Sequence, residues 1–257
     1  MLAQAAPGAS AQQIDCAEGR ARVSAWDRAR APYLGRYCDF LAQAEVRLPQ
    51  EPARAEQAAA AAEALVAGQA APLVLRGRAA LLQGNAEAAR DTGETGRAIE
   101  AYRSLLPRID AIPGEEARTR ARLDAALALM LEGPGGLEVA QTVLKDAAER
   151  GAPALRSVAV AALALALDRA GAQTQAQAAA SEARRAGATA ALAVTPAPLG
   201  WPVEALAVQA RLREVAEPGA AVATWEAYLA RASRGPWAAH ARARLAEAQR
   251  RAPGRKR

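Results

Sequence analysis

The sequence is poor in the residues that carry most enzyme chemistry. It has one histidine, two cysteines and few aromatic residues, which make up 4% of its 257 positions. The single histidine, His240, is flanked by alanines with an arginine two positions on, so a Ser-His-Asp or Cys-His site has no evident set of partners. Counting excludes a metal site built from cysteine and histidine clusters, and no phosphate-binding or dinucleotide-binding glycine motif occurs. We therefore predict no catalytic, metal-binding or cofactor-binding residues, and a protein that is not an enzyme and has no small-molecule substrate.

Lysine is almost absent as well, because Lys145 and Lys256 are the only two, although the formal net charge is +6. The positive charge comes from arginines that alternate with acidic residues, which is typical of solvated helix faces. A GC-rich genome would raise arginine together with alanine, glycine and proline. We therefore do not expect a nucleic-acid partner. The alternative is a nucleic-acid-binding or other cytoplasmic helical-repeat adaptor, whose affinity would fall steeply with salt.

The sequence has no run of alternating β-branched residues, and this disfavours sheets. Alanine instead makes up about three residues in ten, and it combines the highest helix propensity with little bulk. We therefore predict an all-α fold of closely packed helices. Outside the hairpin described next, helices are expected at residues 16–30, 32–48, 53–67, 116–131, 137–150, 153–170, 173–186, 203–216, 220–232 and 236–250.

Residues 71–107 show the pattern most clearly, as two amphipathic segments joined by a turn. Leu73, Gly77, Ala80 and Leu81 recur at steps of three and four residues, which places them along one side of a first helix. Gly84 and Asn85 are expected to end that helix, because glycine adopts positive φ at no cost. The second segment has Ala98, Tyr102 and Leu105 on one stripe and is limited by Pro107.

The pattern of Gly77, Ala80, the Gly84–Asn85 pair, Ala98 and Tyr102 resembles the tetratricopeptide repeat (TPR), a helical pair of about 34 residues. Looser copies follow at residues 127–153, 164–183 and 221–237. The resemblance covers about 150 to 190 residues and implies an α-solenoid of stacked antiparallel helix hairpins that curves into a superhelix. It further implies a protein-protein interaction scaffold whose concave face takes an extended or helical segment of a partner.

By that resemblance, the leading helices of the repeats line the partner groove. The positions are mixed and mostly apolar, so we expect an apolar and partly acidic partner segment. The candidate groove residues are Arg78, Leu81, Arg122, Ala125, Leu129, Ala161, Leu165 and Asp168.

The domain organisation follows from the prolines and glycines between the expected helices. The clearest break is 194–202, with three prolines and a glycine, which is either a hinge or a long loop in which Trp201 packs. We predict a signal-peptide remnant or disordered tail at 1–11, an N-terminal hairpin at 12–50, TPR-like repeats at 51–193, the break at 194–202, a last repeat with a capping helix at 203–251 and a basic tail at 252–257.

The N-terminal region suggests a cellular compartment. Ala9-Ser10-Ala11 fits the end of a signal peptide, although a disordered alanine-rich terminus fits as well. Cys16 and Cys38 are either a disulfide, which requires Cys16 to fold back toward Cys38, or two buried thiols. We expect the disulfide and a periplasmic or extracytoplasmic location, the alternative being the cytoplasm. The protein would then be an accessory component of a bacterial cell-envelope assembly that contacts the membrane only through its partners.

A second alternative is an enzyme of the envelope that acts on glycan, because one glutamate can suffice for such chemistry. It requires an exposed glutamate in a deep cleft with a raised pKa. The paired carboxylates in the sequence, such as Glu115 and Glu116, lie at expected helix starts, where helix capping accounts for them.

Overall fold

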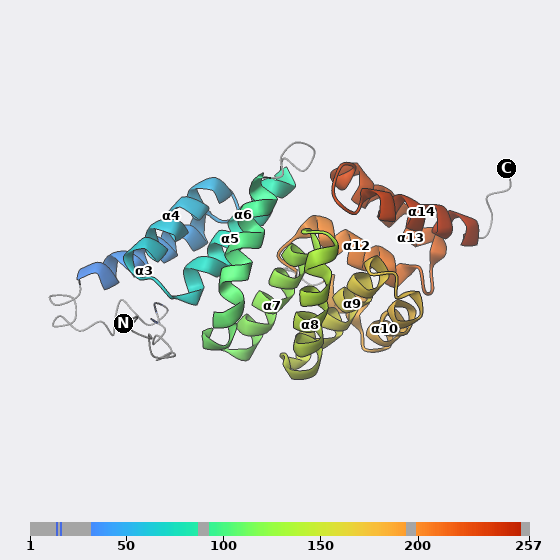
Figure 1. The fold of residues 1–257 in the computed structure, drawn as a ribbon, viewed down its shortest axis with the longest axis horizontal. Helices are drawn as coiled ribbons and strands as arrows, with labels where there is room; N and C mark the ends of the chain where they lie inside the picture. The colour runs from blue at the N-terminus through green and yellow to red at the C-terminus, as the bar shows by residue number, and fades with distance from the viewer. Residues whose placement is uncertain (1–13, 15, 17–31, 87–92, 194–198, 253–257) are drawn as a thin grey trace, which may run out of the picture.

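The computed structural model describes residues 14, 16, 32–86, 93–193 and 199–252 (Figure 1). In this part of the chain the regular structure is helical throughout, without a strand, which confirms the all-α prediction. The helices are α3 (Pro32–Arg47), α4 (Pro52–Leu65), α5 (Ala70–Ala86), α6 (Gly93–Leu105), the 3-10 helix η1 (Leu106–Ala111), α7 (Glu115–Met130), α8 (Pro134–Arg150), α9 (Pro153–Arg169), α10 (Gln173–Arg185), α11 (Ala188–Ala191), α12 (Pro202–Arg213), α13 (Pro218–Ala232) and α14 (Ala238–Arg251).

Prolines and glycines set many of the helix boundaries. Helices α4, α8, α9, α12 and α13 each begin with a proline, whose missing N–H and fixed φ suit the first helical position. Gly133 has a φ of 85° between α7 and α8, and Gly171 has a φ of 80° between α9 and α10. Residues other than glycine are strained at positive φ angles of this size, so these two turns depend on glycine.

The helices stack in sequence order, and each long helix packs along the next one (Figure 1). The leading helices of successive pairs also touch one another, from α5 to α7, from α7 to α9 and from α9 to α12. This arrangement is an α-solenoid of antiparallel helix pairs, as predicted.

The contact between α5 and α6 depends on a small residue. A Cβ atom built on Gly77 would lie 2.6 Å from Cε2 of Tyr102, so only glycine allows this approach. On α6, Ala98, Tyr102 and Leu105 are all fully buried, as their common stripe predicted. The helix ends before Pro107, which also agrees with the prediction.

Two apolar cores run through the described part of the chain. The larger one extends from α5 to α14 and includes most of α9 and the second half of α7, where residues 123–130 are all buried. The smaller one joins α3, α4 and α5 through residues such as Tyr37, Leu41 and Ala59. A disulfide joins Cys16 to Cys38, with 5.4 Å between the Cα atoms, and this confirms the predicted pairing. It fastens a residue 22 positions upstream onto α3.

Three details differ from the prediction. Helix α5 runs through Gly84 and Asn85 to Ala86, because glycine inside a helix costs only about 1 kcal/mol and the next residues are good helix formers. Helix α8 begins at Pro134 rather than at residue 137, and the short α11 was not predicted. Apart from Cys16, the helix expected at 16–30 lies outside the described residues, as do the tail at 1–11 and most of 252–257.

Candidate functional site

Five of the eight predicted groove residues are buried in this structure. Helix α5 holds Arg78 and Leu81, α7 holds Arg122, Ala125 and Leu129, and α9 holds Ala161, Leu165 and Asp168. The two alanines and two leucines on α7 and α9 are 0% exposed, and Asp168 is 1% exposed. The side chains of Arg78 and Arg122 are 31% and 13% exposed, whereas that of Leu81 lies outside the described part of the structure.

The C-terminal third of the chain packs against α7 and α9. The backbone N–H of Gly200 donates to Oδ1 of Asp124 over 2.7 Å. The indole N–H of Trp237 donates to the carbonyl oxygen of Met130 over 2.6 Å. These contacts link residues 76 and 107 positions apart, so residues of the C-terminal third cover part of α7.

The structure thus buries most of the predicted groove positions, and the groove assignment remains a prediction. The resemblance assumes that each leading helix touches only its neighbours and presents one face to the partner. Here Trp201 is only 7% exposed and belongs to the same core as α7 and α9. The predicted packing of Trp201 is confirmed, and described residues 199–202 form a packed connection.

Arg78 and Arg122 form ion pairs with acidic residues of the same chain. The Nε atom of Arg78 lies 2.9 Å from Oδ2 of Asp124, which is fully buried, and this carboxylate raises the pKa of Arg78. Arg122 pairs with both Asp110 and Asp146 at 2.6 and 2.8 Å. These arginines fix α5 and α7 in place.

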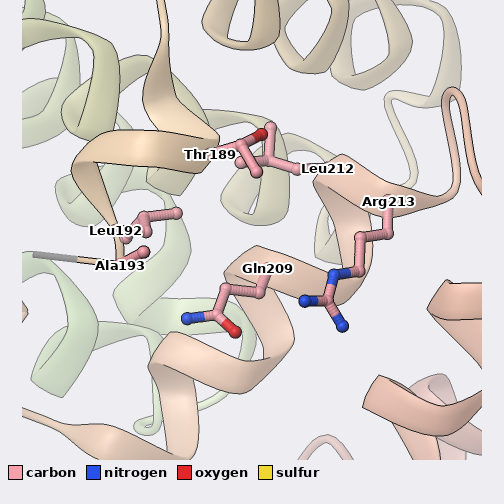
Figure 2. A pocket seen from close by; sticks show the side chains of 6 residues that line it. All are labelled: Thr189, Leu192, Ala193, Gln209, Leu212 and Arg213. Carbon is pink, nitrogen blue, oxygen red and sulfur yellow. The ribbon is translucent and has the colours of Figure 1, made fainter.

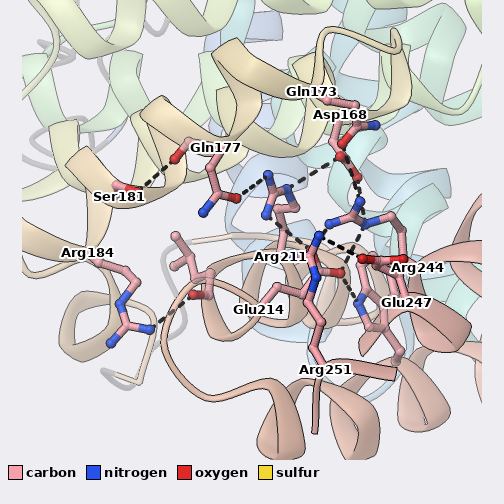
Figure 3. Close-up of polar contacts among 12 residues, drawn as sticks. Asp168, Gln173, Gln177, Ser181, Arg184, Arg211, Glu214, Arg244, Glu247 and Arg251 are labelled. Carbon is pink, nitrogen blue, oxygen red and sulfur yellow. Dashed lines mark hydrogen bonds and ion pairs between the residues drawn. The ribbon is translucent and has the colours of Figure 1, made fainter. Parts of the chain in front are cut away.

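Asp168 on α9 is the centre of a buried ionic cluster (Figure 3). One carboxylate oxygen lies 3.5 Å from Nε of Arg211 on α12. The other lies 3.0 Å from Nε2 of His240 and 3.5 Å from Nε of Arg244, both on α14. Burial favours a higher pKa for Asp168, but the His240 hydrogen bond and the two arginines outweigh burial and keep this pKa below its ordinary value.

Glu214 completes the cluster at the end of α12. It contacts Arg244, accepts a hydrogen bond from Arg211 over 3.1 Å and accepts another from the indole of Trp225 over 2.7 Å. Burial lowers the pKa of Arg211 despite these acidic partners. A second buried pair lies nearby, with Arg169 on α9 2.6 Å from Glu204 on α12. Both sets of contacts hold α12 and α14 onto α9.

The chemistry of these clusters is that of ion pairing. His240 and Asp168 touch as a catalytic pair would, but Arg211 and Arg244 lie beside the same carboxylate. The pKa values of the carboxyl groups of Asp168 and Glu247 lie below their ordinary values. A glycan-cleaving acid needs a raised pKa. No group of three or more histidine, cysteine or acidic side chains could hold a metal ion in the part of the chain that the structure describes.

One small pocket opens between α11 and α12 (Figure 2). We call it the α11–α12 pocket. Its cavity volume is about 150 Å³, and it is lined by Thr189, Leu192, Ala193, Gln209, Leu212 and Arg213. None of these residues was predicted as a site, because α11 itself was not expected.

Sequence reasoning also missed the buried charges. Asp124 and Asp168 lie beside apolar runs of their helices. A buried charge needs a partner, and here Asp124 pairs with Arg78 on α5, whereas Asp168 pairs with Arg211 and Arg244 on α12 and α14. The sequence indicates that each aspartate needs a partner but does not identify it.

The stacked helix pairs and the close contact of Gly77 with Tyr102 define a TPR-like helical-repeat protein. Neither a protein-family profile nor a curated protein matches the chain. Among solved structures, a thermophilic TPR protein of Thermus thermophilus is similar to it, with 20% sequence identity and a TM-score of 0.46. The alignment covers 83% of this chain and 98% of the other.

Proposed function

We propose that this protein is a non-enzymatic interaction scaffold that binds another protein as an accessory component of a bacterial cell-envelope assembly. The observation that carries the proposal is the solenoid of stacked helix pairs. Such units expose a long, repeated surface, and they recognise partners through it rather than through an enclosed cleft. The buried ionic contacts support a structural role for the polar residues, because each links helices that are distant in sequence.

The envelope location rests on separate observations. Disulfides form and persist in oxidising compartments, and the structure pairs Cys16 with Cys38. The Ala9-Ser10-Ala11 sequence fits a signal-peptide cleavage site. In the helices that the structure describes, none is long and apolar enough to cross a membrane. If both thiols are free in protein taken from native cells, the envelope location is contradicted.

The scaffold proposal is tested by crosslinking the tagged, full-length chain in its native cells and identifying what is recovered with it. Half of each sample is treated with nuclease before recovery. We expect the same one or two envelope proteins in repeated experiments, unaffected by nuclease, and direct binding of each purified candidate to this protein. Recovery of nuclease-sensitive material alone, with an affinity that falls steeply with salt, would instead support the nucleic-acid alternative.

A further inference from the structure

The α11–α12 pocket has an apolar floor and an accessible rim. Leu192 and Leu212 form the floor and are 6% and 2% exposed. Thr189 and Ala193 lie on the exposed rim, so a ligand reaches the floor without entering the main core. Figure 2 shows Gln209 between the floor and the mouth, with its amide group pointing away from its own helix.

Arg213 adds a positive charge to this rim. Its Nη1 atom donates to Oγ1 of Thr224 over 2.6 Å, and in the described part of the chain no carboxylate lies within ion-pair distance of it. Most arginines near buried surfaces in this protein do have such a partner, as Arg211 and Arg244 do in the neighbouring cluster. The guanidinium of Arg213 therefore retains donors for an acidic group of another molecule.

We propose that the α11–α12 pocket binds one apolar side chain of a partner protein, with an acidic side chain of the same segment against Arg213. This inference rests on the proposed scaffold function and assigns its contact site. A cavity of about 150 Å³ with apolar walls accepts a group of about the size of benzene, which matches leucine or phenylalanine. The amide of Gln209 can hydrogen-bond to the backbone of that segment, because it carries both a donor and an acceptor.

The direct test uses the purified full-length chain and a defined probe, N-acetyl-leucyl-glutamic acid amide. Methyl groups of leucine are followed by NMR, and those of Leu192 and Leu212 are assigned from leucine-to-isoleucine variants. We expect saturable shifts of both methyl signals with a Kd in the millimolar range, as suits one buried side chain. N-acetyl-leucyl-glutamine amide should bind about twofold to fivefold more weakly, because it lacks the charge.

Two variants separate the apolar and the charged part of the site. Arg213→Gln should reduce the affinity for the acidic probe to that for the neutral one, whereas Arg231→Gln, at an exposed arginine on α13, should change neither. Thr189→Phe should block both probes, because its ring would lie over the mouth. Absence of saturable shifts at Leu192 and Leu212, or equal affinities for the two probes, would overturn the proposal.

Photo-crosslinking in native cells separates this inference from the scaffold function. A photoreactive residue replaces Gln209 in the pocket or Val139, an exposed residue of α8, as control. A partner crosslinked at position 209 and lost on Thr189→Phe supports the pocket. If a partner is crosslinked only at position 139, the pocket is not the contact site, but the scaffold function stands. If no protein is crosslinked at either position, both the contact site and the scaffold function are contradicted. A crosslink from position 209 to residues 194–198 of the same chain would show that the chain fills its own pocket.

Discussion

The two ends of the solenoid are built from similar alanine-rich helices but are held together in different ways. At the N-terminal end, α3, α4 and α5 meet through small and aromatic apolar side chains, and a disulfide fastens Cys16 to α3. At the C-terminal end, α9, α12 and α14 meet through buried ion pairs around Asp168 and Glu204 as well as through apolar contacts.

The difference shows what each kind of contact contributes. Alanines give close packing but little directional information, because many registers bury them equally well. A buried charge is strongly disfavoured without its partner, so an ion pair selects one register. We infer that the buried ionic clusters fix the C-terminal helices in one position on α9. At the N-terminal end the disulfide ties Cys16 to α3, and the partly exposed pair of Arg76 and Glu63 joins α5 to α4.

The largest effect is expected from removing the carboxylate of the C-terminal cluster. Asp168→Ala leaves Arg211 and Arg244 with one fewer acidic partner in a buried site, so the free energy of unfolding should fall by about 3–5 kcal/mol. Urea denaturation followed by circular dichroism measures it. The matched control is Asp110→Ala, because Asp110 is 89% exposed and its pair should contribute less than about 1 kcal/mol. If Asp168→Ala and Asp110→Ala lower the free energy of unfolding equally, the claim that buried ion pairs hold the C-terminal end together is contradicted.

Removing the disulfide should have the next largest effect, and a local one. Replacing Cys16 and Cys38 by serine releases a loop with a sequence separation of 22 residues, which is expected to cost about 3 kcal/mol. Hydrogen exchange should accelerate in α3 and α4 and stay unchanged in α9. Faster exchange along the whole chain would mean that the N-terminal end is not a separate cooperative unit.

A smaller effect is expected at the junction between the two ends. Gly77→Ala places a methyl group 2.6 Å from the ring of Tyr102 and should lower the free energy of unfolding by about 1–3 kcal/mol. Thermal unfolding measures this loss. Gly35→Ala is the control, since a Cβ atom there meets nothing within 4 Å, and it should be neutral or stabilising. If Gly77→Ala is as stable as the natural sequence, α5 and α6 are not packed as closely as the contact of Gly77 with Tyr102 indicates.

The smallest effect at neutral pH is expected from Tyr37→Phe. Tyr37 is fully buried, and its hydroxyl has no hydrogen-bond partner in the described part of the structure, so its loss should change stability by less than about 1 kcal/mol. Burial raises the pKa of Tyr37 from 10.0 to about 12. The folded state therefore holds this proton more tightly, and stability is lost as pH rises from 10.0 towards 12.

Alkaline unfolding of the N-terminal end, followed by hydrogen exchange or near-UV circular dichroism, tests this pH dependence. Tyr37→Phe should unfold at higher pH than the natural sequence. Tyr33→Phe is the control, because it removes the hydroxyl of an exposed side chain on the same helix. Identical alkaline transitions in Tyr37→Phe and the natural sequence would contradict the burial of Tyr37.

The fold was largely predictable from the sequence, because it depends on local patterns. Alanine content, helical spacing and proline positions predicted most helices to within a few residues, and the spacing of Ala98, Tyr102 and Leu105 identified one buried face correctly. Gly84 misled the prediction because a glycine inside a helix costs only about 1 kcal/mol, and α5 continues through Asn85 to Ala86.

The contacts of the C-terminal region with α7 and α9 were not predictable in the same way. They join residues such as Met130 and Trp237, which no spacing rule relates. The TPR resemblance assigned Ala125, Leu129, Ala161 and Leu165 to the groove, and an apolar surface that binds a partner looks the same in sequence as one that packs against the chain's own helices. The aspartates on those helices were the available signal, since a charge in an apolar run needs a specific partner.

The central claim is that buried ion pairs hold α12 onto α9. The most direct measurement is a double-mutant cycle on Arg169 and Glu204, both only 1% exposed at their side chains. Arg169→Met and Glu204→Leu should each lower the free energy of unfolding by about 3–5 kcal/mol, and the double variant should be more stable than either single one. Two small, additive effects would show that these side chains are not in contact and would contradict the claim.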